Sequence, residues 1–114
     1  MITEAEQREA YEFIRPELKG NYSWVISVME DGRIYAMSGE AAIYLLPPLY
    51  TNGKPDLNTA REFLSKLEEK CVHFNFTNLD DSGRWHLHEY VDGEMKHYED
   101  IDFYAAFIQW REAQ

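Results

Sequence analysis

The chain has 114 residues, 45% of them hydrophobic, and a formal net charge of −10 at pH 7, which excludes a wholly disordered chain and argues against nucleic-acid binding through basic surface charge. Its one cysteine, Cys71, excludes an intramolecular disulfide and a zinc site made of cysteines alone. No apolar run reaches the roughly 18 residues of a membrane-spanning helix and the N-terminus lacks a secretory signal pattern, so we expect a cytoplasmic protein.

The first predicted element is an amphipathic helix at the N-terminus. Thr3 and Glu6 have the spacing of a capping box, in which each side chain accepts from a backbone N–H of the other residue. Apolar residues from Tyr11 to Leu18 then follow at helical spacing. Pro16 interrupts this pattern, because proline lacks an N–H and disfavours helix at the preceding residue. We therefore expect a kink or break near Pro16.

Residues 22–38 are predicted to form a β-hairpin. Apolar and polar residues alternate on both sides of Asp31-Gly32, a dipeptide typical of two-residue turns. A two-residue turn there would pair Val28 with Tyr35 across the strands. Since alternate side chains share one side of a strand, this register predicts a core face formed by Trp24, Ile26, Val28, Tyr35 and Met37.

The next segment is uncharged and contains two prolines. Residues 40–46 fit either an edge strand or a short helix, and the strand is preferred; residues 47–56 are predicted to be a loop. The eight residues Ile43–Tyr50 carry no charge. They form either a rigid cover over one end of the core or an exposed surface for a partner, contributed by Tyr44, Leu49 and Tyr50.

The second half of the chain repeats the order of helix and then strands. A helix is expected over residues 57–71, with Cys71 as a small buried apolar residue, followed by strands over 72–77, 85–91 and 94–99 and a final helix. The order α-β-β-(β)-α-β-β-β-α predicts an α+β fold. It would be a single domain, residues 1–114, with a largely antiparallel sheet of two hairpin or meander units packed by about three helices. The expected core residues are Trp24, Ile26, Phe63, Leu67, Phe74, Phe76, Trp85 and Phe107.

Four histidines are expected to gather on one side of a sheet. A two-residue turn at Asp92-Gly93 would place His88 opposite His97 and His86 opposite Glu99. His73 joins them if its strand is the neighbour. Histidines at this spacing can ligate zinc, nickel, copper or iron, and Glu99 could complete such a set. The candidate metal ligands are His73, His86, His88 and His97. The alternatives are a solvated polar face, a pH sensor or proton-transfer chemistry.

Acidic residues are concentrated in two parts of the sequence, residues 1–17 and 80–102. The second part holds eight acidic and two basic residues. If the two parts adjoin in the fold, they form a negative face that attracts a basic partner; the alternative is a solubilising surface. The candidate partner-binding acids are Asp80, Asp81, Glu89, Asp92, Glu94, Glu99, Asp100 and Asp102.

The sequence contains no catalytic signature: it lacks a phosphate-binding glycine loop, a Gly-x-Ser-x-Gly elbow and a His-Glu-x-x-His motif. The first hypothesis is therefore an acidic, non-enzymatic protein-binding module with no cofactor. An inhibitor or immunity-type protein that engages a basic partner, or mimics nucleic acid, is one version, since many small bacterial and phage proteins share this composition. The alternatives are a small metal-dependent or histidine-using enzyme and a homo-oligomeric assembly subunit. The chain is expected to be a monomer or homodimer without direct contacts to nucleic acid or membrane.

Overall fold

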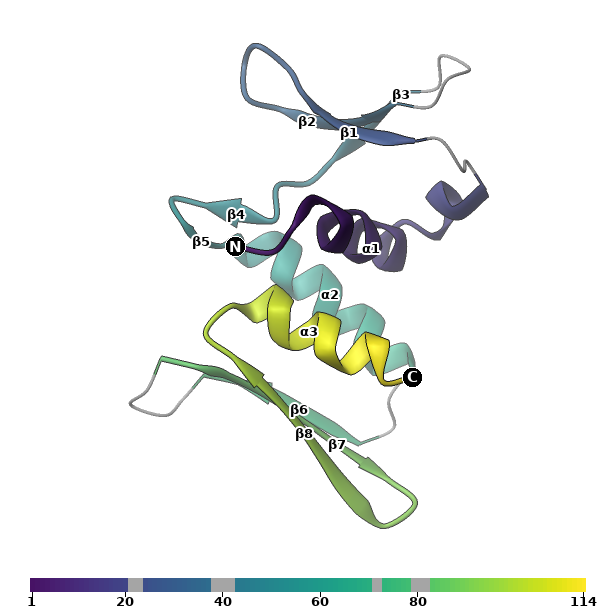
Figure 1. Cartoon of the computed structure of the whole chain (residues 1–114), viewed down its shortest axis with the longest axis vertical. Helices are drawn as coiled ribbons and strands as arrows, with labels where there is room; N and C mark the ends of the chain where they lie inside the picture. Colours follow the sequence, from purple (N-terminus) through teal and green to yellow (C-terminus); the bar gives the residue numbers. More distant parts are fainter. Residues whose placement is uncertain (21–23, 38–42, 71–72, 79–82) are drawn as a thin grey trace.

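The computed structural model describes residues 1–20, 24–37, 43–70, 73–78 and 83–114, and it has the predicted α+β architecture. A layer of three helices lies between two antiparallel three-stranded sheets, β1–β3 and β6–β8 (Figure 1). These sheets lie at opposite ends of the longest dimension of the molecule, which is 46 Å. Each sheet therefore has one side against the helices and one side facing outward.

The N-terminal helix α1 (Glu4–Ile14) begins and ends as predicted. Thr3 Oγ1 accepts from Glu6 N at 3.2 Å and Glu6 Oε1 accepts from Thr3 N at 3.0 Å, which forms the capping box. The α-helix ends at Ile14, and a short 3₁₀ helix, η1 (Pro16–Gly20), follows. Pro16 thus starts a new element instead of kinking a continuous helix.

The first sheet, made of β1 (Val25–Val28), β2 (Ile34–Met37) and β3 (Ile43–Leu46), corrects the predicted hairpin register. Val28 pairs with Ile34 instead of Tyr35. The reason is a three-residue loop, in which Met29 N donates to Arg33 O at 2.7 Å and Gly32 adopts a φ of 86°.

The shift by one residue exchanges the two faces of β2. Ala36 is buried toward the helices with Trp24, whereas Met37 is exposed and Tyr35 lies on the outward side. Val28, at the strand end, is also exposed. The predicted core face was therefore wrong for Val28, Tyr35 and Met37.

The segment that precedes α2 contains more structure than predicted. The strand preferred for residues 40–46 is present over Ile43–Leu46, and the remaining positions lie outside the described residues. Within the expected loop, β4 (Tyr50–Thr51) and β5 (Lys54–Pro55) form a small hairpin. Asn52 and Gly53 turn the chain with φ values of 56° and 76°. An Asn-Gly pair is a strong hairpin signal, so this turn could have been predicted.

The remaining elements follow the predicted order. They are α2 (Leu57–Lys70), β6 (Phe74–Thr77), β7 (Trp85–Val91), β8 (Glu94–Asp100) and α3 (Phe103–Glu112). The Asp56 carboxylate accepts from Thr59 N at 3.0 Å at the start of α2, and the Asp102 carboxylate accepts from Tyr104 N at 2.9 Å at the start of α3. The predicted burial of Cys71 lies outside the described residues.

Aromatic side chains join the helical layer to the second sheet. Phe103 of α3 stacks on Phe76 of β6 with ring centroids 4.5 Å apart, and Phe63 of α2 contacts Phe107 at 4.9 Å. Five of the eight predicted core residues are buried: Trp24, Phe63, Leu67, Phe76 and Phe107. The other three, Ile26, Phe74 and Trp85, are half-buried and pack against the core.

Candidate functional site

The β7–β8 hairpin confirms the register predicted for the histidines. Asp92 and Gly93 have φ values of 51° and 82°, as a two-residue type I′ turn requires. Along the strands, His86 pairs with Glu99 and His88 pairs with His97. Leu87 lies between the two histidines of β7 and is fully buried, so the histidines lie on the outward side. We call this side of β7 and β8 the histidine face; it comprises His86, His88, His97 and Glu99.

Three of the four histidines are in mutual contact on this face. The ring centroids of His88 and His97 are 4.4 Å apart, those of His86 and His97 are 5.2 Å apart, and those of His86 and His88 are 6.2 Å apart. His73 precedes β6, and its carbonyl accepts from Tyr90 N at 3.0 Å. The prediction that at least three histidines share a sheet face is thus confirmed.

Two of these histidines converge with Glu99 on a small volume. His86 Nδ1 lies 3.0 Å from His97 Nε2 and 3.1 Å from Glu99 Oε2, and His97 Nε2 lies 3.9 Å from the same oxygen. Arg84 Nε is also 3.8 Å from Glu99 Oε2. The arrangement can share a proton between the imidazoles, or it can place three lone pairs around one cation.

The surroundings of His88, the third histidine of the cluster, favour the neutral form of its imidazole. Partial burial lowers the pKa of His88, and the neighbouring His97 and His86 lower it further because like charges repel. Both effects make protonation of His88 less favourable than protonation of a free imidazole.

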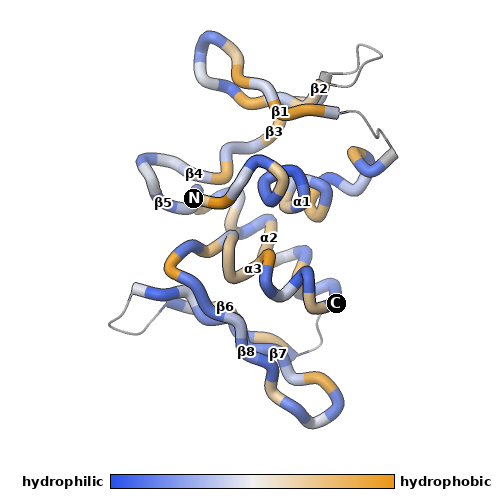
Figure 2. Tube along the Cα trace, viewed as in Figure 1, coloured by the Kyte–Doolittle hydropathy of each residue, from blue (hydrophilic) through white to orange (hydrophobic). Residues whose placement is uncertain are grey.

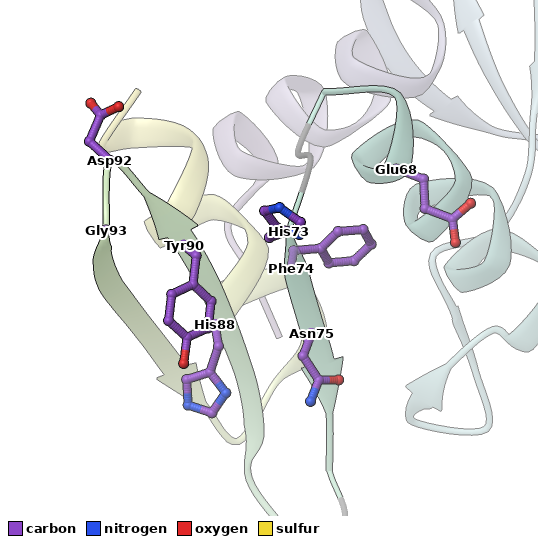
Figure 3. Close-up of a pocket in the computed structure, with 8 residues that line it drawn as sticks. All are labelled: Glu68, His73, Phe74, Asn75, His88, Tyr90, Asp92 and Gly93. Atoms are coloured by element: carbon purple, nitrogen blue, oxygen red, sulfur yellow. The ribbon is translucent and has the colours of Figure 1, made fainter.

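An open groove runs beside the histidine face along the edge strand β6. It has a volume of about 720 Å³, and Figure 3 shows His88 and Tyr90 of β7 on one side and His73, Phe74 and Asn75 on the other. His73 therefore shares a groove with His88 but lies apart from the atoms that converge on Glu99. The strand of His73 is the expected neighbour, since β6 pairs with β7, and His73 lines the groove with His88. The ring contacts join His86, His88 and His97, and only His86 and His97 converge with Glu99 among the described residues.

The structure divides the predicted acidic surface. Glu89 is only 6% exposed and accepts from Trp110 Nε1 at 3.1 Å, so its inclusion in a surface was wrong. The sequence signal for this burial was the spacing from Leu87: residues two positions apart on a strand lie on the same side, and Leu87 was expected in the core. Asp102 caps α3 and also accepts from the Tyr50 hydroxyl at 2.6 Å. Asp100 accepts from the backbone N–H of Asp102.

Among the acidic residues of the predicted set that the structure describes, two have exposed side chains. Asp92 and Glu94 are exposed at the tip of the β7–β8 hairpin, whereas Glu99 faces the histidines. Asp80 and Asp81 lie outside the described residues. The acidic side chains of the second half thus have separate roles in capping, core hydrogen bonding and the hairpin tip.

The uncharged segment is likewise divided between core and surface. Leu49 is buried, which corrects its assignment to a partner surface, and the half-buried Tyr50 is held by its hydroxyl bond to Asp102. Tyr44 is partly exposed on the inward side of β3, in register with Ala36. Leu45 lies on the outward side and is 59% exposed.

The outward side of the β1–β3 sheet is apolar, which sequence reasoning missed. Strand pairing aligns Val25 with Met37, and it aligns Ser27 with Tyr35 and Tyr35 with Leu45. We call these five residues the apolar face. The incorrect two-residue turn had placed Tyr35 and Met37 in the core, which hid this surface. Figure 2 shows the contrast between the hydrophobic stretches of the β1–β3 sheet and the hydrophilic β8 strand.

None of the protein-family models, curated proteins or solved structures with which the chain was compared matches it. Among the residues that the structure describes, no helix is long and apolar enough to cross a membrane.

Proposed function

We propose that the protein is a non-enzymatic interaction module that binds a basic protein partner through its apolar face. The observation that carries the proposal is the composition of this face. Val25, Met37 and Leu45 are exposed there beside Tyr35 and Ser27, and none of the five residues is charged.

An outward sheet face of this kind is unusual in an antiparallel sheet. Such sheets commonly bury one side in the core and carry polar side chains on the other. On the outward side of β7 and β8, His86, His88, His97 and Glu99 follow that rule, and the exposed Tyr90 and Met95 depart from it near the hairpin tip. The outward side of β1–β3 departs from it along all three strands. Contiguous exposed apolar side chains mark interaction surfaces, and tyrosine and methionine are enriched at them. A partner that covers Leu45 and Met37 would remove their apolar surface from water.

Net charge favours a basic partner over a second copy of the chain. Two copies would each bring a charge of −10 and repel one another, whereas a basic protein would be attracted over about a Debye length, about 8–10 Å. The apolar face would provide contact, and the net charge would accelerate association. In the finer version of this proposal, an inhibitor or immunity-type protein, the bound partner loses its own activity.

A charge placed on the apolar face tests the proposal. The variant Leu45→Glu would desolvate a carboxylate in the complex, and Leu57→Glu is the matched control because Leu57 is 74% exposed on α2. Proteins that the wild-type chain retains from an extract of the source cells are identified by mass spectrometry and purified. Each is then titrated calorimetrically with the wild type and both variants at two salt concentrations. We expect a basic protein that binds the wild type and Leu57→Glu, and binds Leu45→Glu at least tenfold more weakly.

Two outcomes would contradict the proposal. One is a partner whose affinity is the same for Leu45→Glu and the wild type, which would place its contact elsewhere. The other is a homodimer, detected by sedimentation equilibrium, that Leu45→Glu dissociates; a second copy of the chain would then occupy the apolar face. For the electrostatic part, an association rate that is unchanged between low and physiological salt would exclude steering by charge.

A further inference from the structure

We propose that His86, His97 and Glu99 form a binding site for a single Zn²⁺ ion, with one coordination position open to solvent. This site lies on the histidine face, at the opposite end of the molecule from the apolar face, so it does not depend on the proposed partner. Each of the three residues offers one potential ligand atom, and these atoms lie within 4.8 Å of one another. Among the residues that the structure describes, no other group of three histidine, cysteine or acidic side chains meets this criterion.

The distances between the three ligand atoms match the size of a zinc ion. His86 Nδ1, His97 Nε2 and Glu99 Oε2 are separated by 3.0, 3.1 and 3.9 Å. A point about 2.0 Å from all three atoms satisfies these separations, and zinc binds imidazole nitrogen at about 2.0–2.1 Å and carboxylate oxygen at about 2.0–2.2 Å. Such a point lies almost in the plane of the three atoms, so tetrahedral coordination requires the His97 and Glu99 side chains to rotate until Nε2 and Oε2 are closer than 3.9 Å.

The backbone holds the ligands in this arrangement. His97 and Glu99 are two residues apart on β8 and share its outward side, and His86 lies directly opposite Glu99 on β7. The tight turn at Asp92-Gly93 sets this register. Ligands carried by paired strands lose little conformational freedom on binding, so the site is largely formed before the ion arrives.

The donor set selects the class of metal. Two imidazole nitrogens with one carboxylate oxygen suit zinc and the neighbouring transition metals, whereas magnesium and calcium prefer oxygen ligands alone. Three protein ligands with a fourth position for water is the composition of zinc sites that are open to exchange. The side chains of His97 and Glu99 are 40% and 43% exposed, so an ion can enter from solvent.

The same contacts also allow a hydrogen-bonded network without metal. One proton between His86 Nδ1 and His97 Nε2 would account for their separation of 3.0 Å, and His86 could instead donate to Glu99. A zinc ion replaces that proton and uses the lone pairs of all three residues. The two accounts differ in a measurable way, because only the zinc site binds one equivalent of metal.

Calorimetric titration of the untagged protein with ZnCl₂ at neutral pH tests the assignment. We expect one ion per chain and a higher thermal midpoint with zinc, because an ion that binds the folded state stabilises it. His97→Asn and Glu99→Gln should each weaken binding at least tenfold. His73→Asn is the matched control, since His73 lies in the neighbouring groove, and it should leave the affinity unchanged.

Far-UV circular dichroism of each variant checks folding, and the two exposed ligand positions provide independent variants. Absence of saturable zinc binding by the folded wild-type protein at 100-fold molar excess would overturn the proposal in favour of the hydrogen-bonded network. Equal weakening by His73→Asn and His97→Asn would overturn the ligand assignment. Leu45→Glu, on the opposite sheet, should bind zinc with wild-type affinity, so failure of the partner proposal leaves this test unaffected.

Discussion

Truncation of Phe63 should be among the most destabilising single changes in this protein. The Phe63 side chain is fully buried on α2 and contacts aromatic rings from both other helices. Its ring centroid lies 6.0 Å from Phe13, 5.2 Å from Tyr104 and 4.9 Å from Phe107. Replacement by alanine would leave a cavity lined by rigid rings, which cannot collapse into the space as flexible aliphatic side chains can.

The magnitude follows from burial and from these ring contacts. Phe→Ala changes in protein cores cost about 3–5 kcal/mol, and each aromatic pair contributes about 0.5–1.5 kcal/mol beyond area burial. Complete burial with several ring partners places Phe63→Ala near the upper end, at about 4–5 kcal/mol. Since small domains have total stabilities of about 5–15 kcal/mol, this loss would bring the protein close to unfolding.

Urea denaturation followed by far-UV circular dichroism measures the loss. Leu57→Ala, on the same helix but highly exposed, is the control and should change the free energy of unfolding by less than about 0.5 kcal/mol. Phe63→Leu retains most of the volume and should cost about 1.5 kcal/mol or less, so it remains measurable if the alanine variant unfolds. A cost below about 2 kcal/mol for Phe63→Ala would show that Phe63 is not at the centre of the core.

Two further predictions concern β6 and the start of α2. Phe76→Ala should cost about 3–5 kcal/mol and Phe74→Ala clearly less, because Phe76 is buried on Phe103 whereas Phe74 is half-buried; equal costs in urea denaturation would contradict the packing. Two hydrogen bonds lower the pKa of Asp56 below its ordinary value of 3.8: the larger effect comes from the backbone N–H of Thr59 and the smaller from the Thr51 hydroxyl. Its stabilising contribution is therefore full above that value and is lost as pH falls through the lowered pKa, so Asp56→Asn should flatten the decline in unfolding free energy between about pH 5 and pH 2. An unchanged acid profile would refute this role.

The two Asp-Gly turns illustrate where sequence reasoning succeeds and where it fails. Asp92-Gly93 forms the expected two-residue turn, whereas Asp31-Gly32 belongs to a three-residue loop. An Asp-Gly sequence permits either a two-residue or a three-residue loop. The two loops differ in strand register by one residue, so they place opposite sides of the second strand in the core. In the first hairpin, the register set by the longer loop places Trp24 and Ala36 on the same side, and both are buried toward the helices. Trp24 Nε1 also donates to Glu12 Oε1 of α1 at 2.9 Å, a contact that no strand pattern contains.

Alternation along the strands accounts for the histidine face but not for its chemistry. Strand parity and the Asp92-Gly93 turn placed His86, His88 and His97 on one side. The same parity does not give side-chain rotamers, which decide whether ring nitrogens converge. The structure selects His86 and His97 with Glu99 and leaves His73 in the neighbouring groove.

By itself the sequence determined the order of the three α-helices and of the strands in the two larger sheets, the ends of the first helix and the register of the β7–β8 hairpin. These features depend on contacts between residues close in the chain: caps, turns and alternating side chains. Tertiary structure decided which side of β1–β3 faces the helices, the burial of Glu89 against Trp110 and the convergence of His86, His97 and Glu99. The physical reason is that these features depend on packing between distant elements, and local periodicity establishes only which residues share a side.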